Sequence, residues 1–323
     1  MQNAQHLVKA LQYMAAADGK SSQAIAVATA KAGPESGPVK ILKTWALTSG
    51  SISPELRSAY RELIALAERR SLLAQIRAVS PMRRVPFETD TLLQTGESQV
   101  GFIGEGGAYP VSSTTYENAR LPGRKLGGII PISDMLIKGY DFDFAVTGEL
   151  TRAVAEAESQ GFYSAVAGSS ESPAGILHGV TPGTGSSNAA NDVAALIDAF
   201  DGDLGSAVIL TSPRAGVKLF AAGFESSGAR GGDLAGIAHV AHRSVPDDEI
   251  AILDCSRILI ADDNGLEIVS SQSAALGVLD SSGELVGELV SMFQTNTSAF
   301  RITRYVNWKP ADGAVGYMTG ATW

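Results

Sequence analysis

The stretch from Val85 to Ile132 constrains the fold most, because it alternates short β-prone pieces with glycine and proline. Three such pieces, SQVGFI, TTYENARL and GGIIPIS, are separated by GEGGAYP and LPG. Gly and Pro punctuate a chain, whereas Val, Ile, Thr and Tyr favour extended backbone. The pattern predicts two long strands joined by a polar, glycine-marked tip. We therefore expect a β-hairpin arm that reaches away from a core.

The composition indicates a folded chain with a sizeable core and excludes several classes of protein. The 323 residues are 45% hydrophobic and 18% charged, so burial can offset the entropy lost on ordering. A net charge of −9 argues against a protein that holds nucleic acid by neutralising phosphates. The single cysteine, Cys255, excludes an intrachain disulfide framework. Neither a membrane-spanning run nor a secretion signal is recognisable, so we expect synthesis in a cytosol.

Two helices are predicted from their end signals and period. One begins at Ser53-Pro54-Glu55, where a capping serine precedes a proline and an acidic residue, and it should break before Ser80-Pro81. The other covers Asp141–Ala167, the longest helical pattern in the chain. In that helix Arg152 lies three residues after Glu149 and four before Glu156. Ion pairs along its exposed face are therefore expected.

The remaining segments predict a mixed α+β chain without internal repeats. Residues 1–50 suggest an extended arm with one helix. Asn191-Asp192 should cap a helix, and Pro213 should begin another after the buried-type strand AVILTS. Two β-runs, EIAILD and RILIADD, precede Asn264-Gly265, a strong signal for a two-residue hairpin turn. Further strands are expected in GELVGELVSMF, SAFRITRYVNW and AVGYMT.

Three segments resemble ligand-binding motifs, but each lacks residues that the motif requires. GEGGAY lacks the glycine spacing and the following helix of a phosphate-binding loop. Asp262-Asp263-Asn264-Gly265 lacks the alternating ligands and the closing glutamate of a calcium loop, so a β-turn is the better interpretation. His239 and His242 are three residues apart, but no third and fourth ligands follow at a suitable spacing.

Catalytic arrangements are equally poorly supported. No G-x-S-x-G elbow is present, and four histidines leave few candidate bases. Cys255 lies in an apolar β-run, where a small buried hydrophobe is the simpler role. We expect no catalytic residue, no cofactor and no metal site, and we interpret the chain as a protein without enzymatic activity.

One long segment nevertheless matches the pattern of a known family. From Gly101 to Lys138 the sequence GFIGEGGAYPVSSTTYENARLPGRKLGGIIPISDMLIK resembles the extended-loop signature of the tailed-bacteriophage major capsid proteins, which have the Hong Kong 97 fold. The positions that carry the resemblance are Phe102, Gly104, Glu105, Gly106, Lys125, Pro131 and Ser133. Segments such as AGSSESPAGIL, AVILTSPRAGVKL and MFQTNTSAFRITRYVNWKP resemble later parts of the family in the same order. The resemblance covers roughly residues 85–318.

The resemblance implies an α+β, Hong Kong 97-like fold with an arm, an extended loop, a long spine helix, and peripheral and axial domains. The implied domains are an N-terminal arm with helix (1–84), the extended loop and flanking strands (85–135), a peripheral domain with the spine helix (136–184), an axial domain (185–285) and the return strands of the peripheral domain (286–323). The loop itself, about residues 96–128, would lie on a neighbouring subunit.

The function implied is that of a major capsid protein. Copies would form hexamers and pentamers of an icosahedral head shell around double-stranded DNA, without sequence-specific binding and without a membrane. A portal protein is an implied partner, and separate scaffolding and decoration proteins are further candidates. The expected location is the virion, after assembly in the cytoplasm of a host bacterium. An arm and a hairpin with little core of their own fit such a shell, because other subunits would bury them.

Six charged residues are the candidates for contacts between subunits: Glu105, Arg120, Arg124, Lys125, Glu149 and Arg152. Solvated charges on a strand or a helix are an equally good interpretation of any one of them.

Two further expectations concern covalent chemistry and processing. Some members of the family form an isopeptide bond from a lysine near the loop tip, but this chain has no lysine from Thr44 to Arg124. We therefore predict a shell without such crosslinks. We also hypothesise that residues 1–80 form a retained arm, rather than a scaffolding segment that a protease removes.

Two alternatives stay open at this point. An encapsulin-like nanocompartment shell would share the fold but package an enzyme. A hydrolase that uses Cys255 or a histidine is a remote alternative, because no nucleophile, base and orienting group can be assembled from the sequence.

Overall fold

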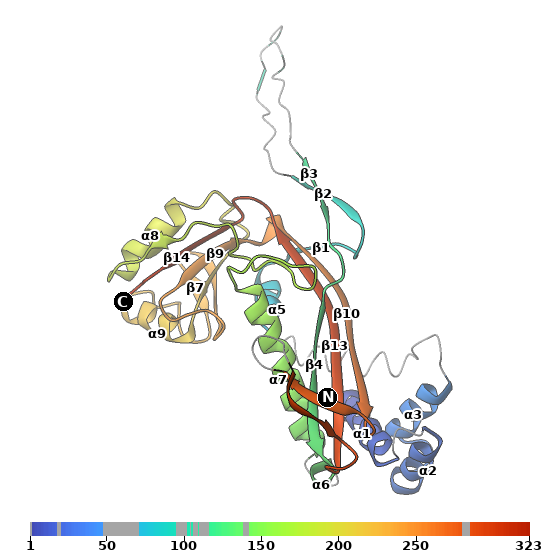
Figure 1. Ribbon diagram of the computed structural model, residues 1–323. Coiled ribbons are helices and arrows are strands. Elements are labelled where there is room, and N and C mark those ends of the chain that lie inside the picture. Colours follow the sequence, from blue (N-terminus) through green and yellow to red (C-terminus); the bar gives the residue numbers. More distant parts are fainter. Residues whose placement is uncertain are drawn as a thin grey trace. The chain divides into compact units, whose positions relative to one another are not determined.

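The computed structural model describes residues 2–17, 21–47, 71–94, 116–137, 142–279 and 285–323, and also Phe102, Ile103, Glu105 and Tyr109. These residues form a mixed helix and sheet fold, as expected (Figure 1). The helices are α1 (Gln2–Ala16), α2 (Ser21–Ala32), α3 (Gly37–Leu47), α5 (Leu72–Val79), α6 (Asp134–Ile137), α7 (Phe142–Phe162), α8 (Ala189–Asp198), α9 (Pro213–Ala221) and the short 3-10 helix η1 (Cys255–Arg257).

Within the described residues the strands belong to four sheets, two of which have two strands each. The strands are β1 (Arg83–Arg84), β2 (Asp90–Gln94), β3 (Tyr116–Arg120), β4 (Lys125–Ser133), β5 (Gly183–Thr184), β6 (Ala207–Thr211), β7 (Gly232–Leu234), β8 (Ile237–Ala241), β9 (Ile250–Asp254), β10 (Ile258–Ser271), β11 (Ala275–Leu279), β12 (Leu285–Ser291), β13 (Thr297–Pro310) and β14 (Val315–Thr319). The orders are β1-β10-β13-β4, β5-β14-β9-β6-β8-β7, β2-β3 and β11-β12.

The chain divides into two compact units. Unit 1 comprises residues 1–70, 126–155 and 264–305, and unit 2 comprises 71–125, 156–263 and 306–323. The division falls inside α7, β10 and β13, which are continuous elements. Each unit is therefore built from segments that are far apart in the sequence.

The six-stranded sheet of unit 2 separates two apolar clusters. Every residue of β6 and β9 is buried. Along β6, Val208 and Leu210 join one cluster, while Ile209 joins the other. Successive side chains of a strand point to opposite faces, so a continuous apolar run fits a strand that is covered on both sides. The predicted strands AVILTS and EIAILD are confirmed.

Helices α8 and α9 contribute to the second of these clusters through Val193, Leu196 and Leu219. The start of α9 is confirmed at Pro213, where the Ser212 side chain accepts a hydrogen bond from the Ala215 N–H at 3.0 Å. The predicted cap of α8 is wrong by three residues.

The N-cap of α8 is Asn188, whose side chain accepts hydrogen bonds from the N–H groups of Ala190 and Asn191. Asn191 and Asp192, the expected cap, lie inside the helix, where Asp192 accepts hydrogen bonds from the Ser186 N–H and hydroxyl. Asn188, Asn191 and Asp192 are all good capping residues, so the sequence alone left the position of the cap ambiguous.

Unit 1 holds an N-terminal group of three helices, so the expectation of an extended arm with one helix is wrong. Helices α1, α2 and α3 all pack on one another. Their small residues, such as Ala10, Ala24 and Ala28, are buried with Leu11 and Leu42. Alanine has the highest helix propensity, so the Ala-rich segment that suggested an irregular arm favours helix.

The three helices share one apolar cluster with the strands of unit 1. Val154 of α7, Ile268 of β10, and Phe300 and Ile302 of β13 belong to the same buried cluster as the helical residues. Close packing also explains a glycine: a Cβ atom at Gly37 would lie 2.5 Å from the His6 ring. The segment is thus part of the folded core of unit 1.

Strand β10 corrects a second expectation. It runs without interruption from Ile258 to Ser271, so the hairpin turn predicted at Asn264-Gly265 is wrong. Pairing with β13 on one side supplies backbone hydrogen bonds along the strand. Long-range pairing of a whole strand thus overrides the turn preference of two residues.

The ends of two predicted helices can be compared with the structure. Helix α7 confirms the long helix but ends at Phe162, five residues before the predicted end. Helix α5 ends at Val79, and Ser80 is extended, as expected for a residue that precedes proline. The predicted start at Ser53-Pro54-Glu55 lies outside the described residues.

Strands β2 and β3 confirm part of the expected hairpin. They pair antiparallel, with Asp90 opposite Arg120 and Gln94 opposite Tyr116 (Figure 1). Most of the predicted tip, including Gly104 and Gly106, lies outside the described residues. Strand β4 follows, and Pro131 fits its position at the sheet edge, because proline cannot donate a hydrogen bond to a further strand.

Candidate inter-subunit contact surface

The β2–β3 hairpin has one buried and one exposed face. Residues opposite each other in an antiparallel pair share a face. On the inner face, Leu93 and Ala119 are buried in the main apolar cluster of unit 2. The other face, which we call the outer face, consists of exposed residues: Asp90, Leu92, Tyr116, Asn118 and Arg120.

The outer face displays large apolar side chains. Leu92 is 59% exposed and Tyr116 is 55% exposed. Phe102 and Tyr109, in the stretch between the two strands, are exposed as well. Large apolar side chains that a chain leaves exposed are often covered by a partner. Among the described residues, the outer face of the hairpin exposes two such side chains, Leu92 and Tyr116.

Several contacts hold the hairpin from its inner side and its base. Lys309 of β13 forms an ion pair with Glu117 of β3. The Arg83 guanidinium donates a hydrogen bond to the Leu92 carbonyl at 3.1 Å. These anchors fix the orientation of the outer face within unit 2.

Arg120, a predicted contact residue, lies on the outer face and has a partner within the chain. Its Nη2 is 2.8 Å from Oε2 of Glu88. Glu88 also donates its backbone N–H to the Leu121 carbonyl at 3.0 Å. Both side chains of the pair are more than half exposed, so the ion pair contributes little to stability.

Arg124 and Lys125 are adjacent in the sequence but differ in their contacts. The Arg124 guanidinium donates a hydrogen bond to the Ser170 carbonyl, and the Arg124 carbonyl accepts one from the Val306 N–H. Arg124 thus joins separate segments of unit 2. Lys125 is exposed at the start of β4, and within the described part of the chain no hydrogen bond or ion pair joins its side chain to another residue.

Glu105, the fourth predicted contact residue of the loop, is exposed. Its immediate neighbours Gly104 and Gly106 lie outside the described residues. The four loop candidates therefore differ in their surroundings: Arg120 is paired, Arg124 is half-buried, and Lys125 and Glu105 are exposed.

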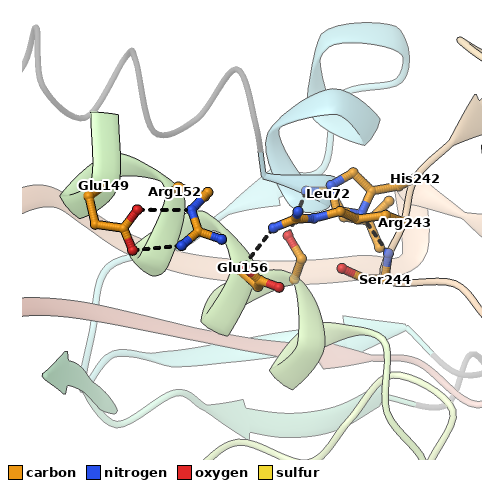
Figure 2. A network of polar contacts seen from close by, with 8 residues as sticks. Leu72, Glu149, Arg152, Glu156, His242, Arg243 and Ser244 are labelled. Carbon is orange, nitrogen blue, oxygen red and sulfur yellow. Dashed lines mark hydrogen bonds and ion pairs between the residues drawn. The ribbon is translucent and has the colours of Figure 1, made fainter. Parts of the chain in front are cut away.

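Helix α7 carries the other two candidates (Figure 2). Figure 2 shows Arg152 bound to Glu149 by two contacts, with Nη2–Oε1 at 2.6 Å and Nε–Oε2 at 3.1 Å. The hydrogen bond and the positive charge of Arg152 lower the pKa of Glu149. The expected ion pair three residues apart is confirmed. Both side chains are about half exposed.

Glu156, further along α7, pairs with a residue that sequence analysis did not single out. Its Oε2 lies 2.6 Å from Nη2 of Arg243, in the loop after β8 (Figure 2). Arg243 follows His242, whose Nδ1 accepts a hydrogen bond from the Ser244 N–H at 3.2 Å. The sequence separation of these partners leaves no local pattern that would have revealed the pair.

The end of α7 also holds the start of α5. The Ser159 hydroxyl accepts a hydrogen bond from the Leu72 N–H at 2.9 Å, and the Ser71 hydroxyl donates to Glu158 at 2.9 Å. A side chain of α7 thus supplies the cap that the N-terminus of α5 requires. This attachment was not predicted, because the partners are 87 residues apart.

The histidine pair considered for metal binding has a different role in the structure. Nε2 of His239 lies 2.7 Å from Oγ1 of Thr211, and Nδ1 lies 2.9 Å from Oγ of Ser227. Both ring nitrogens therefore have hydroxyl partners inside the protein. Burial lowers the pKa of His239 to about 4. Among the described residues no group of three or more potential ligands is placed to hold a metal ion.

Two other residues considered for chemistry are also accounted for. Cys255 is buried, and burial raises the pKa of its thiol to about 12, which suits an inert apolar side chain. Asp262 lies on β10 and forms an ion pair with Arg77 at 3.4 Å. In the described part of the chain, no helix is long and apolar enough to cross a membrane.

Comparison with known proteins agrees with this architecture. The Phage capsid family matches residues 54–319. The capsid polyprotein of Pseudomonas phage PAJU2 is 27% identical over 314 residues, covering 87% of this chain and 46% of the polyprotein. The chain thus spans just under half the length of this curated relative.

Solved structures support the fold. The capsid of a native GTA particle has a TM-score of 0.51 at 16% identity, and the match covers 91% of this chain and 99% of that chain. A structure from Mycobacterium phage Adephagia has a TM-score of 0.51 at 16% identity, over 86% of this chain and 96% of that chain. The family match extends over most of the sequence, and the resemblance first suggested by the loop residues is confirmed. The chain belongs to the phage capsid family.

Proposed function

We propose that the chain is the major capsid protein of a tailed phage. Copies form hexamers and pentamers, and these build an icosahedral head shell that encloses double-stranded DNA. The family match makes the chain a structural component of a virion that associates with copies of itself. It also favours a phage shell over an encapsulin-like nanocompartment or a hydrolase.

The observation that carries the proposal is the one-sided burial of the β2–β3 hairpin. Leu93 and Ala119 anchor its inner face, while Leu92 and Tyr116 stay exposed on the outer face. A two-stranded hairpin is marginal on its own and gains stability from packing. A neighbouring subunit that covers the outer face supplies this packing, and the extended loop, about residues 96–128, would then lie on that neighbour.

The domain roles follow from the same proposal. Helix α7 acts as the spine helix of a peripheral domain, together with the return strands in 286–323. Residues 185–285 act as the axial domain around the centres of hexamers and pentamers. Arg120, Lys125 and Glu105 are candidates for ion pairs between subunits, since each carries an exposed charge on or near the loop.

We propose that the N-terminal segment is retained in the mature shell. The cluster of unit 1 supports this, because loss of α1–α3 would uncover Phe300 and Ile302 of β13. Mass spectrometry of subunits from mature particles should find residues 1–47, and their absence would contradict the proposal. The lack of a lysine from Thr44 to Arg124 supports a shell without isopeptide crosslinks. A denaturing gel with a ladder of covalent multimers would overturn that part.

The wider partners rest on the family alone. A portal protein would occupy one vertex, separate scaffolding and decoration proteins would join during assembly, and assembly would take place in the host cytoplasm. Co-purification with the products of neighbouring genes tests these partners directly.

Expression of the chain alone tests the central proposal. Sedimentation followed by negative-stain imaging should reveal hollow particles of at least roughly 2 MDa, the mass of about 60 copies of a 33.5 kDa subunit. If only small oligomers form, coexpression with a scaffolding protein should restore the particles. Failure in both cases would contradict the shell function.

A further inference from the structure

The negative net charge of the chain is not spread evenly. Residues 1–47 contain five lysines and two acidic residues, for a net charge of +3. Because the whole chain has a net charge of −9, residues 48–323 carry −12. A charge asymmetry of this kind is a sign of a surface that binds a polyanion. The basic part coincides with α1–α3.

Packing directs these charges outward. The apolar side chains of α1–α3 are buried in the cluster of unit 1, whereas Lys9, Lys31, Lys40 and Lys43 are all exposed. Lys31 lies in the last turn of α2. Lys40 and Lys43 are three residues apart on α3, so they lie on the same side of that helix.

Contacts hold two of the lysines against the turn that follows a third, Lys31. Nζ of Lys40 lies 3.5 Å from Oε2 of Glu35, and Nζ of Lys43 lies 3.4 Å from the Pro34 carbonyl oxygen. Pro34 and Glu35 belong to the turn that follows Lys31 and joins α2 to α3. We call Lys31, Lys40 and Lys43 the α2–α3 lysine cluster.

The lysines could simply stabilise this turn, so the strength of their contacts matters. The Lys40 and Glu35 side chains are 53% and 81% exposed, and exposed ion pairs contribute little. The hydrogen bond of Lys43 is long and exposed. Glu35 balances one of the three positive charges, so a local excess of two remains at the surface.

We propose that the α2–α3 lysine cluster binds the phosphate backbone of double-stranded DNA without reading its sequence. This rests on the proposed function, in which the shell encloses DNA. Ammonium groups act as point charges toward phosphates, and each contact releases counterions. The face of the subunit that carries the cluster is then turned toward the genome, while the acidic remainder of the chain repels DNA.

The small charge per subunit suits this role. Two excess charges bind DNA weakly in one copy, but many linked copies act together on one polymer. Such contacts order the outermost DNA and still release it when the genome leaves. The family match begins at residue 54, so the cluster belongs to a segment outside the matched region.

Salt-dependent DNA binding tests the proposal with the full-length chain. The probe is linear double-stranded DNA of mixed sequence, titrated from about 20 mM salt upward, since phosphate contacts weaken steeply with salt. The test variant is Lys31→Gln/Lys43→Gln, which leaves the Lys40–Glu35 pair intact. The control is Arg214→Gln/Arg230→Gln, which removes the same charge from exposed residues of unit 2.

The wild-type protein and the control should bind DNA with the same salt slope. The test variant should bind more weakly, with a log–log slope shallower by about 1 to 2 per subunit. Equal weakening in both variants would overturn the proposal, because total charge alone would then decide binding. So would a wild-type protein that does not retain DNA at about 20 mM salt, or that binds polyglutamate as tightly as DNA.

Particle formation, measured in parallel, separates this proposal from the proposed function. Variant particles that assemble normally but retain less DNA support the role of the cluster. A wild-type chain that binds DNA through these lysines but never forms particles, even with scaffold, supports the cluster and contradicts the shell. Thermal unfolding of each variant verifies that the three helices remain folded.

Discussion

The six-stranded sheet and the β2–β3 hairpin, both in unit 2, show two ways in which strands of one chain are completed. In β6 and β9 every residue is buried, and alternate side chains enter two different apolar clusters. In the hairpin only the inner face is buried, through Leu93 and Ala119. The outer face keeps Leu92 and Tyr116 exposed.

The difference shows which parts of the subunit are self-sufficient, meaning that the chain itself buries their apolar side chains. Helices and neighbouring strands cover the sheet on both faces, so its stability is a property of the single chain. The outer face of the hairpin has no such cover among the described residues. Substitutions in the first region should therefore change folding, and substitutions in the second should change assembly.

The largest loss of folding stability is expected on substitution of Phe162, which is fully buried. Its ring packs edge-on against the Trp308 ring, with the ring centroids 5.3 Å apart. Phe162→Ala should lower the free energy of unfolding of the unassembled subunit by about 4 kcal/mol, because it leaves a cavity in the core. Urea unfolding measures this change. Phe220→Ala is the control, since Phe220 is 54% exposed, and it should cost less than about 1 kcal/mol. Equal losses would contradict the assignment of the core.

The next largest loss of stability is expected at Asp254, a buried carboxylate at the end of β9 in the six-stranded sheet. It accepts hydrogen bonds from the Asp203 N–H and from both the N–H and the hydroxyl of Ser256, and a further one from the Ser206 hydroxyl. Burial raises the pKa of Asp254, but these hydrogen bonds outweigh burial and hold it below the usual value.

Asp254→Ala should cost about 3 kcal/mol in the free energy of unfolding at pH 7, because four hydrogen bonds to a fully buried carboxylate are lost. The exposed Asp312 provides the control with the same change of charge. If Asp312→Ala destabilises the subunit as much, the effect of Asp254 would reflect net charge and not its hydrogen bonds.

A pH effect of intermediate size is expected from His239. The Thr211 hydroxyl donates to the Ser212 carbonyl, so Nε2 of His239 donates to Thr211 and Nδ1 accepts from Ser227. The buried ring is held neutral, with its pKa lowered to about 4 by burial. The unfolded chain binds a proton near the ordinary pKa of about 6.5, so this contribution is complete above that pH and is lost as pH falls toward 4.

Unfolding free energies of the wild-type protein and His239→Asn should therefore be compared across pH. From pH 7 to 4.5 the wild-type subunit should lose roughly 2 kcal/mol more than the variant. The variant is less stable at pH 7, so the comparison uses the slope with pH and not the absolute value. Parallel curves would show that His239 does not titrate as its burial requires.

The self-sufficient region was also the more predictable one. The runs AVILTS and EIAILD are apolar enough to identify buried strands, and Ser212-Pro213 marks a helix start without tertiary information. The turn at Asn264-Gly265 failed because pairing in a sheet outweighs the preference of two residues. One helix was expected in residues 1–50, whereas the structure has three in residues 1–47. Helix α2 was missed because its Ala-rich sequence lacks a strong apolar period, and α3 because the Gly and Pro at its start indicate a turn.

The contact candidates were found through the family resemblance, but their partners could not be. Arg120 meets Glu88 over 32 residues, and Arg124 meets Ser170 over 46. Only the Arg152–Glu149 pair follows from local spacing, since a helix brings residues three apart together. Long-range partners depend on how segments pack, which no short pattern encodes.

The hairpin itself should show a small effect on folding and a large one on assembly. Leu92→Ser/Tyr116→Ser should change the stability of the unassembled subunit by no more than about 0.5 kcal/mol, because both side chains are exposed. Particle yield by sedimentation should nevertheless fall strongly, since the two apolar side chains of the outer face are lost. Val217→Ser, at a site 52% exposed on α9, is the control and should assemble normally. Normal assembly of the double variant would contradict the role of this face.

The smallest effect on folding is expected from the exposed ion pairs. Arg120→Gln and Arg152→Gln should each lower the unfolding free energy by about 0.3 kcal/mol, because solvent screens pairs of this exposure. The two variants should differ in particle yield, which is the more informative measurement. Arg120 shares the outer face with Leu92 and Tyr116, so its loss should reduce particle yield, and added salt should reduce the yield of the wild-type protein in the same way. If Arg120→Gln assembles as well as the wild-type protein, its pair with Glu88 is only an internal contact, and the outer face acts through its apolar side chains alone.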